Sequence, residues 1–324
     1  MKNAHQARAC VRVGDLFSGA GLFGQAFYDE GAYLQFAVEM DPQAAASYSR
    51  NIGAHVRVGR VEELGPPQSV DVLVAGPPCQ GFSTLGRRDP KDVRNQLCLE
   101  IPRWAKTSGA SVVVVENVPP FLRSTQWRTM TQSLDALGFE ITTWILNAAD
   151  YGVPQYRNRS FTIGSRIGIP TLPQKSAQKS AGEVFLGIPR KDPMQIWPEQ
   201  NPLRAARMKL LPRNGDRRDL LRLNPALCPP SWHLLGCQAT DVWGRIDPTM
   251  PSNTLRCDFQ NPSKGRYIHP TKDRLISLRE GARLQQIPDK WILEGSRTSI
   301  TRQIGNGVPL GLGQAVARQV LDLF

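Results

Sequence analysis

The chain has 324 residues, of which 40% are hydrophobic, so it can bury the core of one large domain or of two ordinary ones. Its 40 Lys and Arg against 28 Asp and Glu give a net charge of +12, which argues for a polyanionic partner, although a generically basic protein has the same balance. The six cysteines lack paired or metal-ligand spacing, which argues against a disulfide framework and a structural zinc site. No hydrophobic run is long enough for a signal peptide or a membrane span, so we expect a cytoplasmic protein.

Short apolar strands alternate with amphipathic helices from Val11 to about Ser165. The predicted strands are Val11–Phe17, Gln35–Glu39, Val70–Ala75, Val112–Glu116 and Glu140–Leu146. The predicted helices lie near Leu22–Glu30, Pro42–Asn51, Asn95–Lys106 and Gln126–Leu137. This alternation predicts an α/β fold in which helices cover both faces of a parallel sheet.

The pattern changes between Arg166 and Lys272. This third of the chain carries 17 Lys and Arg against 8 Asp and Glu, which is +9 of the net +12, and it is rich in proline. Three tryptophans within it indicate a packed segment, so we predict a smaller, irregular basic domain inserted into the first. Helical patterning returns at Ser277, and Pro309–Leu323 is predicted as a closing helix. The predicted boundaries are therefore 1–165, 166–272 and 273–324.

The segment DLFSGAGLFGQAF (Asp15–Phe27) has the pattern of a strand, a glycine turn and the start of a helix. Gly19 and Gly21 allow the backbone to approach a ligand, and the first helical turn offers amide donors without intrahelical partners. Glu39, at the end of the next predicted strand, is placed to accept hydrogen bonds from both hydroxyls of a ribose. The pattern fits a nucleoside-containing cofactor; a dinucleotide site, a structural turn and an exposed strand-end glutamate remain alternatives.

The segment GPPCQGFS (Gly76–Ser83) follows a predicted strand and is the most specific signal in the chain. Ligands of open α/β sheets bind beyond the carboxyl ends of the strands, which is where Cys79 lies after two stiff prolines, Pro77 and Pro78. We interpret Cys79 as a nucleophile rather than as a buried packing residue. Glu116 ends the apolar strand VVVVE, where an ionisable group is costly unless it is used or paired.

Seven segments occur in the order and approximate spacing of the DNA cytosine-5 methyltransferases. They are DLFSGAG, VEMD, GPPCQGFS, ENV, QYRNR, REGARLQQIPD and QIGNGVP, and the resemblance covers Val11–Ser165 and about Leu275–Phe324. It implies the Rossmann-like fold of S-adenosylmethionine-dependent methyltransferases, with a mixed, mostly parallel sheet, and makes the insert a target-recognition domain. It also implies S-adenosylmethionine as cofactor, double-stranded DNA as substrate, and extrusion of the target cytosine from the duplex.

The resemblance further implies roles for individual residues. Cys79 is similar to the family's nucleophile, which adds to carbon 6 of cytosine so that carbon 5 can attack a methyl donor. Glu116 resembles the proton donor and hydrogen-bond partner at ring nitrogen 3, a role that requires a raised pKa. Arg159 resembles the arginine that binds the cytosine carbonyl oxygen, with Arg157 and Gln155 supporting the site. The expected catalytic residues are therefore Cys79, Glu116, Arg157 and Arg159.

The remaining candidates form two groups, and no metal site is predicted. The expected cofactor-binding residues are Phe17, Ser18, Gly19, Ala20, Gly21, Leu22, Glu39, Met40, Arg60, Val61, Pro77, Leu97, Asn306 and Val308. The expected DNA-binding residues are Pro78, Gln80, Ser83, Arg94, Asn117, Gln155 and Thr254. Residues 80–97 resemble the family's mobile loop that closes on DNA. Its basic side chains, Arg87, Arg88, Lys91 and Arg94, suit phosphates, although a solvated basic loop has the same composition.

Two residues depart from the family pattern. Leu22 stands where the family has a second consecutive glycine. Arg60 stands where the family has an aspartate that contacts the adenine amine, and a guanidinium cannot accept that hydrogen bond. Either Glu62 or a backbone carbonyl takes this role, or the affinity for the cofactor is lower than usual.

The leading prediction is a DNA cytosine-5 methyltransferase of a bacterial restriction–modification system, working as a monomer, with an independent cognate restriction endonuclease as a candidate partner. A transfer RNA cytosine-5 methyltransferase would use the same catalytic residues, although the large basic insert favours duplex DNA. A catalytically inactive DNA-binding protein is supported only by Arg60 and Leu22. A nicotinamide-dependent oxidoreductase explains the glycine turn but leaves GPPCQGFS, ENV and QYRNR unexplained.

Overall fold

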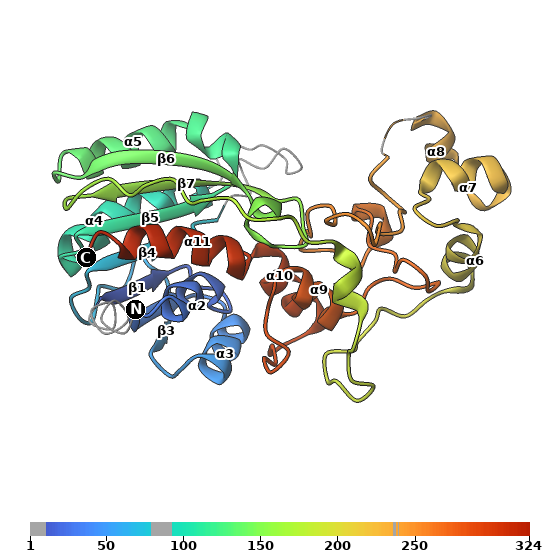
Figure 1. Cartoon of the computed structure of the whole chain (residues 1–324), viewed down its shortest axis with the longest axis horizontal. Coiled ribbons are helices and arrows are strands. Elements are labelled where there is room, and N and C mark those ends of the chain that lie inside the picture. Colours follow the sequence, from blue (N-terminus) through green and yellow to red (C-terminus); the bar gives the residue numbers. More distant parts are fainter. Residues whose placement is uncertain (1–10, 79–92, 236–237, 239) are drawn as a thin grey trace.

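A computed structural model describes residues 11–78, 93–235, 238 and 240–324 (Figure 1). Its strands form one sheet in the order β3-β2-β1-β4-β5-β7-β6. The strands are β1 (Arg12–Leu16), β2 (Tyr33–Glu39), β3 (Val56–Val58), β4 (Val72–Ala75), β5 (Val112–Asn117), β6 (Glu140–Asn147) and β7 (Asn158–Ser165). Pairing is parallel among β1 to β5, whereas β7 runs antiparallel to β5 and β6. The predicted mixed, mostly parallel sheet is confirmed.

Helices cover both faces of this sheet and continue into the rest of the chain. They are α2 (Leu22–Asp29), α3 (Pro42–Asn51), α4 (Glu100–Ser108), α5 (Thr125–Asp135), α6 (Pro202–Leu210), α7 (Arg217–Leu223), α8 (Pro230–Leu235), α9 (Leu278–Leu284), α10 (Arg297–Asn306) and α11 (Leu310–Leu321). The short 3₁₀ turns are η1 (Val93–Leu99), η2 (Pro119–Arg123), η3 (Ala148–Tyr151), η4 (Ala181–Phe185), η5 (Pro225–Leu227) and η6 (Pro262–Lys264). Within the part of the chain that the structure describes, no helix has the length and apolar character needed to cross a lipid bilayer.

The central strands are buried on both sides. In β4, Val72 and Val74 pack with α2 and α11, whereas Leu73 and Ala75 pack with α4 and α5. β5 alternates in the same way between the two layers. Because successive side chains of a strand point to opposite faces, a strand covered on both faces must be apolar throughout. This burial explains the uninterrupted run VVVV, which leads to Glu116 near the carboxyl end of β5.

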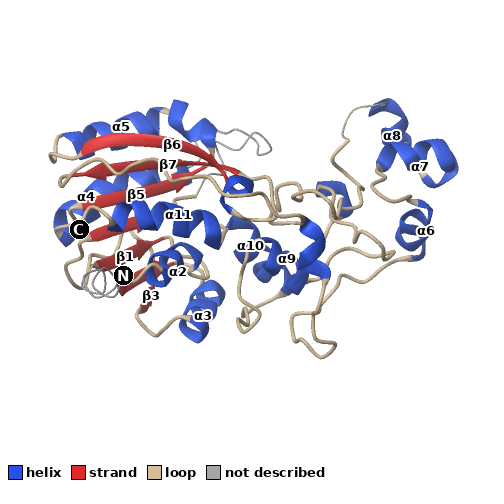
Figure 2. Cartoon of the chain, in the orientation of Figure 1, coloured by secondary structure: helices blue, strands red, loops and turns tan. Residues whose placement is uncertain are grey.

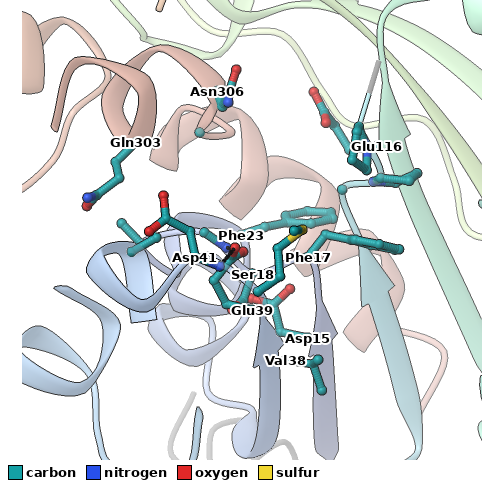
Figure 3. A pocket seen from close by; sticks show the side chains of 18 of the residues that line it. Asp15, Phe17, Ser18, Phe23, Val38, Glu39, Asp41, Glu116, Gln303 and Asn306 are labelled. Atoms are coloured by element: carbon teal, nitrogen blue, oxygen red, sulfur yellow. Dashed lines mark hydrogen bonds between the residues drawn. The ribbon is translucent and has the colours of Figure 1, made fainter. Parts of the chain in front are cut away.

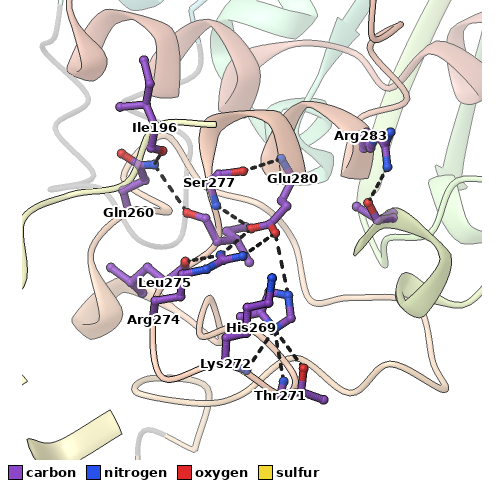
Figure 4. A network of polar contacts seen from close by, with 12 residues as sticks. Ile196, Gln260, His269, Thr271, Lys272, Arg274, Leu275, Ser277, Glu280 and Arg283 are labelled. Atoms are coloured by element: carbon purple, nitrogen blue, oxygen red, sulfur yellow. Dashed lines mark hydrogen bonds and ion pairs between the residues drawn. The ribbon is translucent and has the colours of Figure 1, made fainter. Parts of the chain in front are cut away.

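Most of the insert lies beside the sheet, to its right in Figure 1, as α6, α7 and α8 joined by loops. Figure 2 shows the strands confined to the other side of the molecule. The hydrophobic core of the insert, which contains Trp232 and Trp243, continues into Leu278 of α9 and Ile304 of α10. By contrast, α11 returns to the sheet and packs beside α2. Figure 4 shows polar contacts at the same junction, where His269 of the insert and Arg274 both lie beside Glu280 of α9. The C-terminal segment therefore joins the two parts.

The structure contains elements that the sequence pattern did not predict. β3 is three residues long and mostly exposed, so no apolar run marks it. β7 begins with the polar residues Asn158 and Arg159, which hid its strand character. α10 has the sequence RTSITRQIGN, in which Ile300 and Ile304 are the apolar residues and form a stripe only one turn long. β7 and α10 contribute residues to the cavity described below, and β3 leads directly into Gly59 and Arg60, which also line it.

Candidate active site

A cavity of about 580 Å³ lies at the carboxyl-terminal edge of the parallel strands (Figure 3). The residues that end or follow β1 to β5 form one wall, and α10 with the turn after it forms the other. Parallel strands end at the same edge of a sheet, so segments distant in sequence converge there. Ser18, Glu39, Pro77, Glu116 and Asn306 consequently line one space.

The structure brings nearly all expected cofactor-binding residues together. Those that line the cavity are Phe17, Ser18, Gly19, Ala20, Leu22, Glu39, Met40, Arg60, Val61, Pro77, Leu97, Asn306 and Val308. Gly21 does not line it, because Gly21 caps α2 with a φ of +93° and packs against Tyr48 and Ile52. Four of the expected catalytic and DNA-binding residues share the wall, namely Pro78, Glu116, Asn117 and Arg159.

Glu39 is held at the end of β2 by two backbone amides. The Gly19 N–H donates to Oε2 at 2.7 Å, and the Asp41 N–H donates to Oε1 at 2.8 Å. Burial raises the pKa of Glu39, and these backbone donors oppose the rise. Each carboxylate oxygen keeps a second lone pair, so Glu39 can also accept hydrogen bonds from neighbouring hydroxyls of a ligand.

The turn after β1 offers further groups to a ligand. The Ser18 hydroxyl is buried and has no hydrogen-bond partner among the described residues, a situation that costs about 1–3 kcal/mol until a partner binds. A Cβ added at Gly19 would meet no atom within 4 Å, so the backbone here opens onto the cavity. Phe17 has a φ of +56°, a strained conformation of the kind found at ligand sites. This turn is therefore shaped for a ligand rather than for packing.

Glu116 ends β5 and meets Arg159 of the neighbouring strand β7. Arg159 Nε lies 2.8 Å from Glu116 Oε1, and the two side chains are only 14% and 10% exposed. Burial raises the pKa of Glu116, although Arg159 and Arg157 act in the opposite direction. The cavity therefore contains a carboxyl group that binds a proton more tightly than an exposed glutamate does, beside a guanidinium.

Asn117 fixes the turn that leads to Cys79. Its Nδ2 donates to the carbonyl oxygen of Pro77 at 3.2 Å, and its Oδ1 accepts from Val118 N–H at 2.8 Å. The turn is thus anchored to the strand that carries Glu116. The predicted residues outside the described part of the chain are Cys79, Gln80, Ser83, Arg87, Arg88 and Lys91, together with the side chain of Arg94.

Comparisons with known proteins identify the family. The model of the C-5 cytosine-specific DNA methylase family matches residues 11–207 and 233–322. The chain belongs to this family. The methylase is 30% identical to the Type II methyltransferase M.DdeI of Desulfomicrobium norvegicum, an alignment that covers 97% of this chain and 89% of the relative. It is also 30% identical to the Type II methyltransferase M.XorII of Xanthomonas oryzae, with 95% and 84% covered.

Solved structures share the fold of the methylase. A DNA modification methyltransferase encoded within an E. coli prophage superposes with a TM-score of 0.70 at 22% identity, covering 97% of this chain and 99% of that one. The Dnmt2 methyltransferase of S. pombe gives a TM-score of 0.62 at 19% identity, covering 97% and 98%. The predicted Rossmann-like methyltransferase fold is confirmed. Family membership likewise confirms the predicted cytosine-5 DNA methyltransferase function, its DNA substrate and S-adenosylmethionine as cofactor.

The cavity of the methylase fits this cofactor. Glu39 offers carboxylate oxygens that suit the vicinal hydroxyls of a ribose. The Ser18 hydroxyl, which has no hydrogen-bond partner among the described residues, can bond to a polar group of the ligand. Gly19 leaves open space beside both, while Phe17 and Val61 supply apolar lining of the kind that an adenine ring needs. These residues therefore match the parts of an adenosine-containing ligand.

Gly19→Ala and Gly21→Ala form a matched pair of variants. Both glycines have a positive φ, +56° and +93°, so each alanine strains the backbone by about 1–2 kcal/mol. Only at Gly21 would the new methyl group overlap neighbours, 2.3 Å from Ile52 and 2.6 Å from Tyr48, which adds about 1–3 kcal/mol. We expect urea unfolding to show the larger loss of stability for Gly21→Ala. Calorimetry should show the larger rise in the Kd of the cofactor for Gly19→Ala. The reverse order in either measurement would contradict a packing role for Gly21 and a ligand-facing role for Gly19.

Arg157 supports the site without lining the cavity. Arg157 is 2% exposed, and its guanidinium donates to the carbonyl oxygens of Leu255 at 2.9 Å and Gly305 at 2.6 Å. Residues 255 and 305 belong to segments that the sequence separates widely. Arg157 therefore holds the end of the insert against the end of α10, which fits the supporting role expected for it.

Gln155 and Thr254 belong to the same support. Gln155 is fully buried; its Oε1 accepts from Leu255 N–H at 2.8 Å, and its Nε2 donates to Gln285 Oε1 at 3.0 Å. The Thr254 hydroxyl donates to the Tyr156 carbonyl at 2.7 Å. A fully buried carboxamide with internal partners cannot also contact DNA, so the structure favours a supporting role for Gln155 over the expected direct contact.

The two departures from the family pattern have visible consequences. Arg60 Nη2 lies 2.6 Å from Glu62 Oε1, and both residues line the cavity. An acceptor, the Glu62 carboxylate, thus stands beside the donor-only guanidinium. Leu22 is 2% exposed, and a Cβ added at Gly307 would lie 2.9 Å from its Cδ2. Leu22 therefore packs α2 against the turn that closes the cavity.

Sequence reasoning missed several residues of the cavity. Asp15, Phe23, Arg302 and Gln303 line it, and Figure 3 shows Asp15 and Gln303 on opposite walls. Arg302 and Gln303 lie in α10, which the sequence pattern did not predict. Asp15 carried a signal that could have found it, because a carboxylate inside the apolar strand VGDLF is costly unless it serves a purpose.

Asp15 should make the stability of the methylase depend on pH. Burial raises its pKa to about 8, although the Gly24 N–H, 3.1 Å from Oδ2, works against the rise. An aspartate in the unfolded chain titrates near 3.8, so between these values the folded state binds the extra proton. The free energy of unfolding should then fall as the pH rises from about 4 to 8, by at most about 1.4 kcal/mol per pH unit.

The variant Asp15→Asn keeps the acceptor for Gly24 and removes the titration. Urea unfolding at pH 5.5, 6.5 and 7.5 should show a slope for the wild type that is reduced in Asp15→Asn. If the free energy of unfolding depended on pH in the same way for both proteins, Asp15 would not be protonated in the folded state at neutral pH.

Proposed function

We propose that the methylase methylates carbon 5 of a cytosine swung out of double-stranded DNA, with Cys79 as the nucleophile and S-adenosylmethionine as the specific methyl donor. The observation that carries this proposal is the buried Glu116–Arg159 pair, 2.8 Å apart beside the turn that precedes Cys79. Carbon 6 of cytosine is stacked inside the duplex, so the thiolate reaches it only after extrusion, which costs a few kcal/mol.

The chemistry follows from the charges in the site. As the Cys79 thiolate bonds to carbon 6, the 5,6 double bond is lost and Glu116 gives its proton to ring nitrogen 3, while Arg159 stabilises the carbonyl oxygen. The resulting enamine is nucleophilic at carbon 5. Bound S-adenosylmethionine supplies the methyl group. A base then removes the carbon-5 proton, the double bond re-forms, the thiolate of Cys79 leaves, and Glu116 recovers its proton.

The cavity residues divide between the parts of the cofactor. Glu39 accepts hydrogen bonds from the ribose hydroxyls, and Phe17 packs on the adenine ring. Asn306 and Val308 complete the wall of the cavity from the C-terminal segment. Glu62, held by Arg60 at 2.6 Å, accepts a hydrogen bond from the adenine amine in place of the family's aspartate. In this assignment the carboxylate that binds the adenine amine lies at position 62, two residues after the position of the family's aspartate.

Methyl incorporation tests the proposed substrate. Purified protein is incubated with radiolabelled S-adenosylmethionine and either genomic DNA lacking cytosine methylation or transfer RNA. We expect label in DNA, released as 5-methylcytosine, and bisulfite sequencing should then place it in one recurring sequence context. Label in transfer RNA alone, or DNA binding without transfer, would overturn the proposal in favour of an RNA methyltransferase or an inactive binding protein.

The relatives support a wider proposal about partners. M.DdeI and M.XorII carry the name Type II methyltransferase, so we place this methylase in a bacterial restriction–modification system, on DNA in the cytoplasm, with a nuclease that acts independently. Residues 166–272 form its target-recognition domain, and residues 273–324 complete the catalytic domain. We expect a monomer; light scattering should give a mass near 35.9 kDa, and twice that value would contradict it.

A further inference from the structure

Asn306, in the wall of the cavity, meets a cysteine to which the proposed chemistry gives no part. Asn306 is the last residue of α10 and lines the cavity. Cys257 lies near the end of the insert, and its thiol donates a hydrogen bond to Asn306 Oδ1 at 2.8 Å. This hydrogen bond therefore connects the insert to one of the expected cofactor-binding residues of the cavity.

The main chains beneath this pair are held tightly. A Cβ added at Gly305 would lie 2.6 Å from both Cα and N of Cys257, so the two segments touch through a glycine. Arg157 spans the same contact by donating to Leu255 O at 2.9 Å and to Gly305 O at 2.6 Å. The side chain of Asn306 is exposed. The backbone is thus fixed, and the thiol acts on the orientation of the exposed carboxamide.

That orientation determines which atom a ligand meets. A carboxamide carries an acceptor oxygen and a donor nitrogen on opposite sides. In Figure 3 the oxygen of Asn306 points away from Ser18 and Glu39. With the oxygen engaged by Cys257, the nitrogen keeps its two N–H groups for an acceptor in the cavity. The negatively charged acceptor on the proposed cofactor is the carboxylate of its methionine part.

We propose that Cys257 is a positioning residue for cofactor binding, whose thiol turns the Asn306 carboxamide so that Nδ2 donates to the carboxylate of the bound cofactor. The inference rests on the proposed use of S-adenosylmethionine. The demethylated product, S-adenosylhomocysteine, keeps this carboxylate and loses the positive charge on sulfur. Cys257 therefore acts on both ligands, and a stable, unreactive probe is available.

Calorimetric titration with S-adenosylhomocysteine tests the inference without requiring catalysis. Cys257→Ala should raise Kd about fivefold, the effect of one net hydrogen bond. Cys257→Ser keeps a donor and should stay within about twofold of the wild type. In a double-mutant cycle, Cys257→Ala should add little to Asn306→Ala, since each removes the same interaction. Melting temperatures of the unliganded proteins establish that each variant folds.

Three results would overturn the inference: an unchanged Kd for Cys257→Ala, a Kd for Cys257→Ser as high as that for Cys257→Ala, or additive effects with Asn306→Ala. Asn306→Asp leaves Cys257 in place and provides a second route should the alanine variant be unstable. Its carboxylate repels that of the ligand, so Kd should exceed that of Asn306→Ala, and an equal or lower Kd would again overturn the inference. A wild-type protein that fails to bind S-adenosylhomocysteine would instead overturn the proposed function.

Discussion

Cys79→Ser should lower the rate of methyl transfer to DNA by about 10⁴-fold or more, while the Kd for S-adenosylhomocysteine changes little. Addition to carbon 6 requires a thiolate, and a serine hydroxyl is a far weaker nucleophile without an adjacent base. Single-turnover incorporation of a labelled methyl group measures the rate, and calorimetry measures the binding.

A second cysteine provides the control for this prediction. Cys98 is 2% exposed in the core between α4 and the sheet, and burial raises the pKa of its thiol to about 12. It is therefore inert at neutral pH, and Cys98→Ser should retain the wild-type rate apart from any loss of stability. Transfer by Cys79→Ser within tenfold of the wild type would contradict the assigned nucleophile.

Glu116→Gln should lower kcat by about 10²–10⁴-fold, because glutamine can donate a hydrogen bond but cannot transfer a proton to ring nitrogen 3. Burial raises the pKa of Glu116, so the wild type holds its acid form to a higher pH than an exposed glutamate would. As the pH rises through that pKa, the acid form is lost and kcat should fall. This alkaline fall should be absent from the residual activity of Glu116→Gln.

Glu30→Gln is the matched control for Glu116→Gln. It breaks another ion pair between Glu and Arg, Glu30 with Arg318 at 2.8 Å, on the outer surface of α2 and α11. We expect its kcat to stay within about twofold of the wild type, because neither Glu30 nor Arg318 lines the cavity. A pH–rate profile unaltered by Glu116→Gln would remove Glu116 from the proton transfer.

The sequence predicted the parts of the site that follow buried strands. Glu39 and Glu116 each lie at the end of a run whose apolar character predicted a buried strand, and parallel strands end at the same edge of a sheet, so both residues line one cavity. Cys79 was predicted from the same kind of pattern and lies outside the described residues. The glycine turn at Gly19 was predictable for the same reason. Local pattern was sufficient in these cases because one element alone determines the position of each residue.

The remaining features depend on elements that meet from distant parts of the chain. The Glu116–Arg159 pair exists because β7 inserts antiparallel between β5 and β6, and no local pattern in QYRNRSF specifies that order. The far wall of the cavity comes from α10, whose apolar stripe is one turn long. The contacts of Arg157 with residues 255 and 305 likewise require the tertiary arrangement of three segments.

A duplex that carries 5-fluorocytosine at the target position tests the central claim most directly. Fluorine cannot leave carbon 5 as a proton does, so the adduct between Cys79 and carbon 6 should persist after methyl transfer. We predict a complex of protein and DNA that survives denaturing electrophoresis, requires S-adenosylmethionine, and yields a peptide modified at Cys79 by mass spectrometry. Trapping that persists in Cys79→Ala, or no trapping by a wild-type protein that methylates the unmodified duplex, would contradict the account.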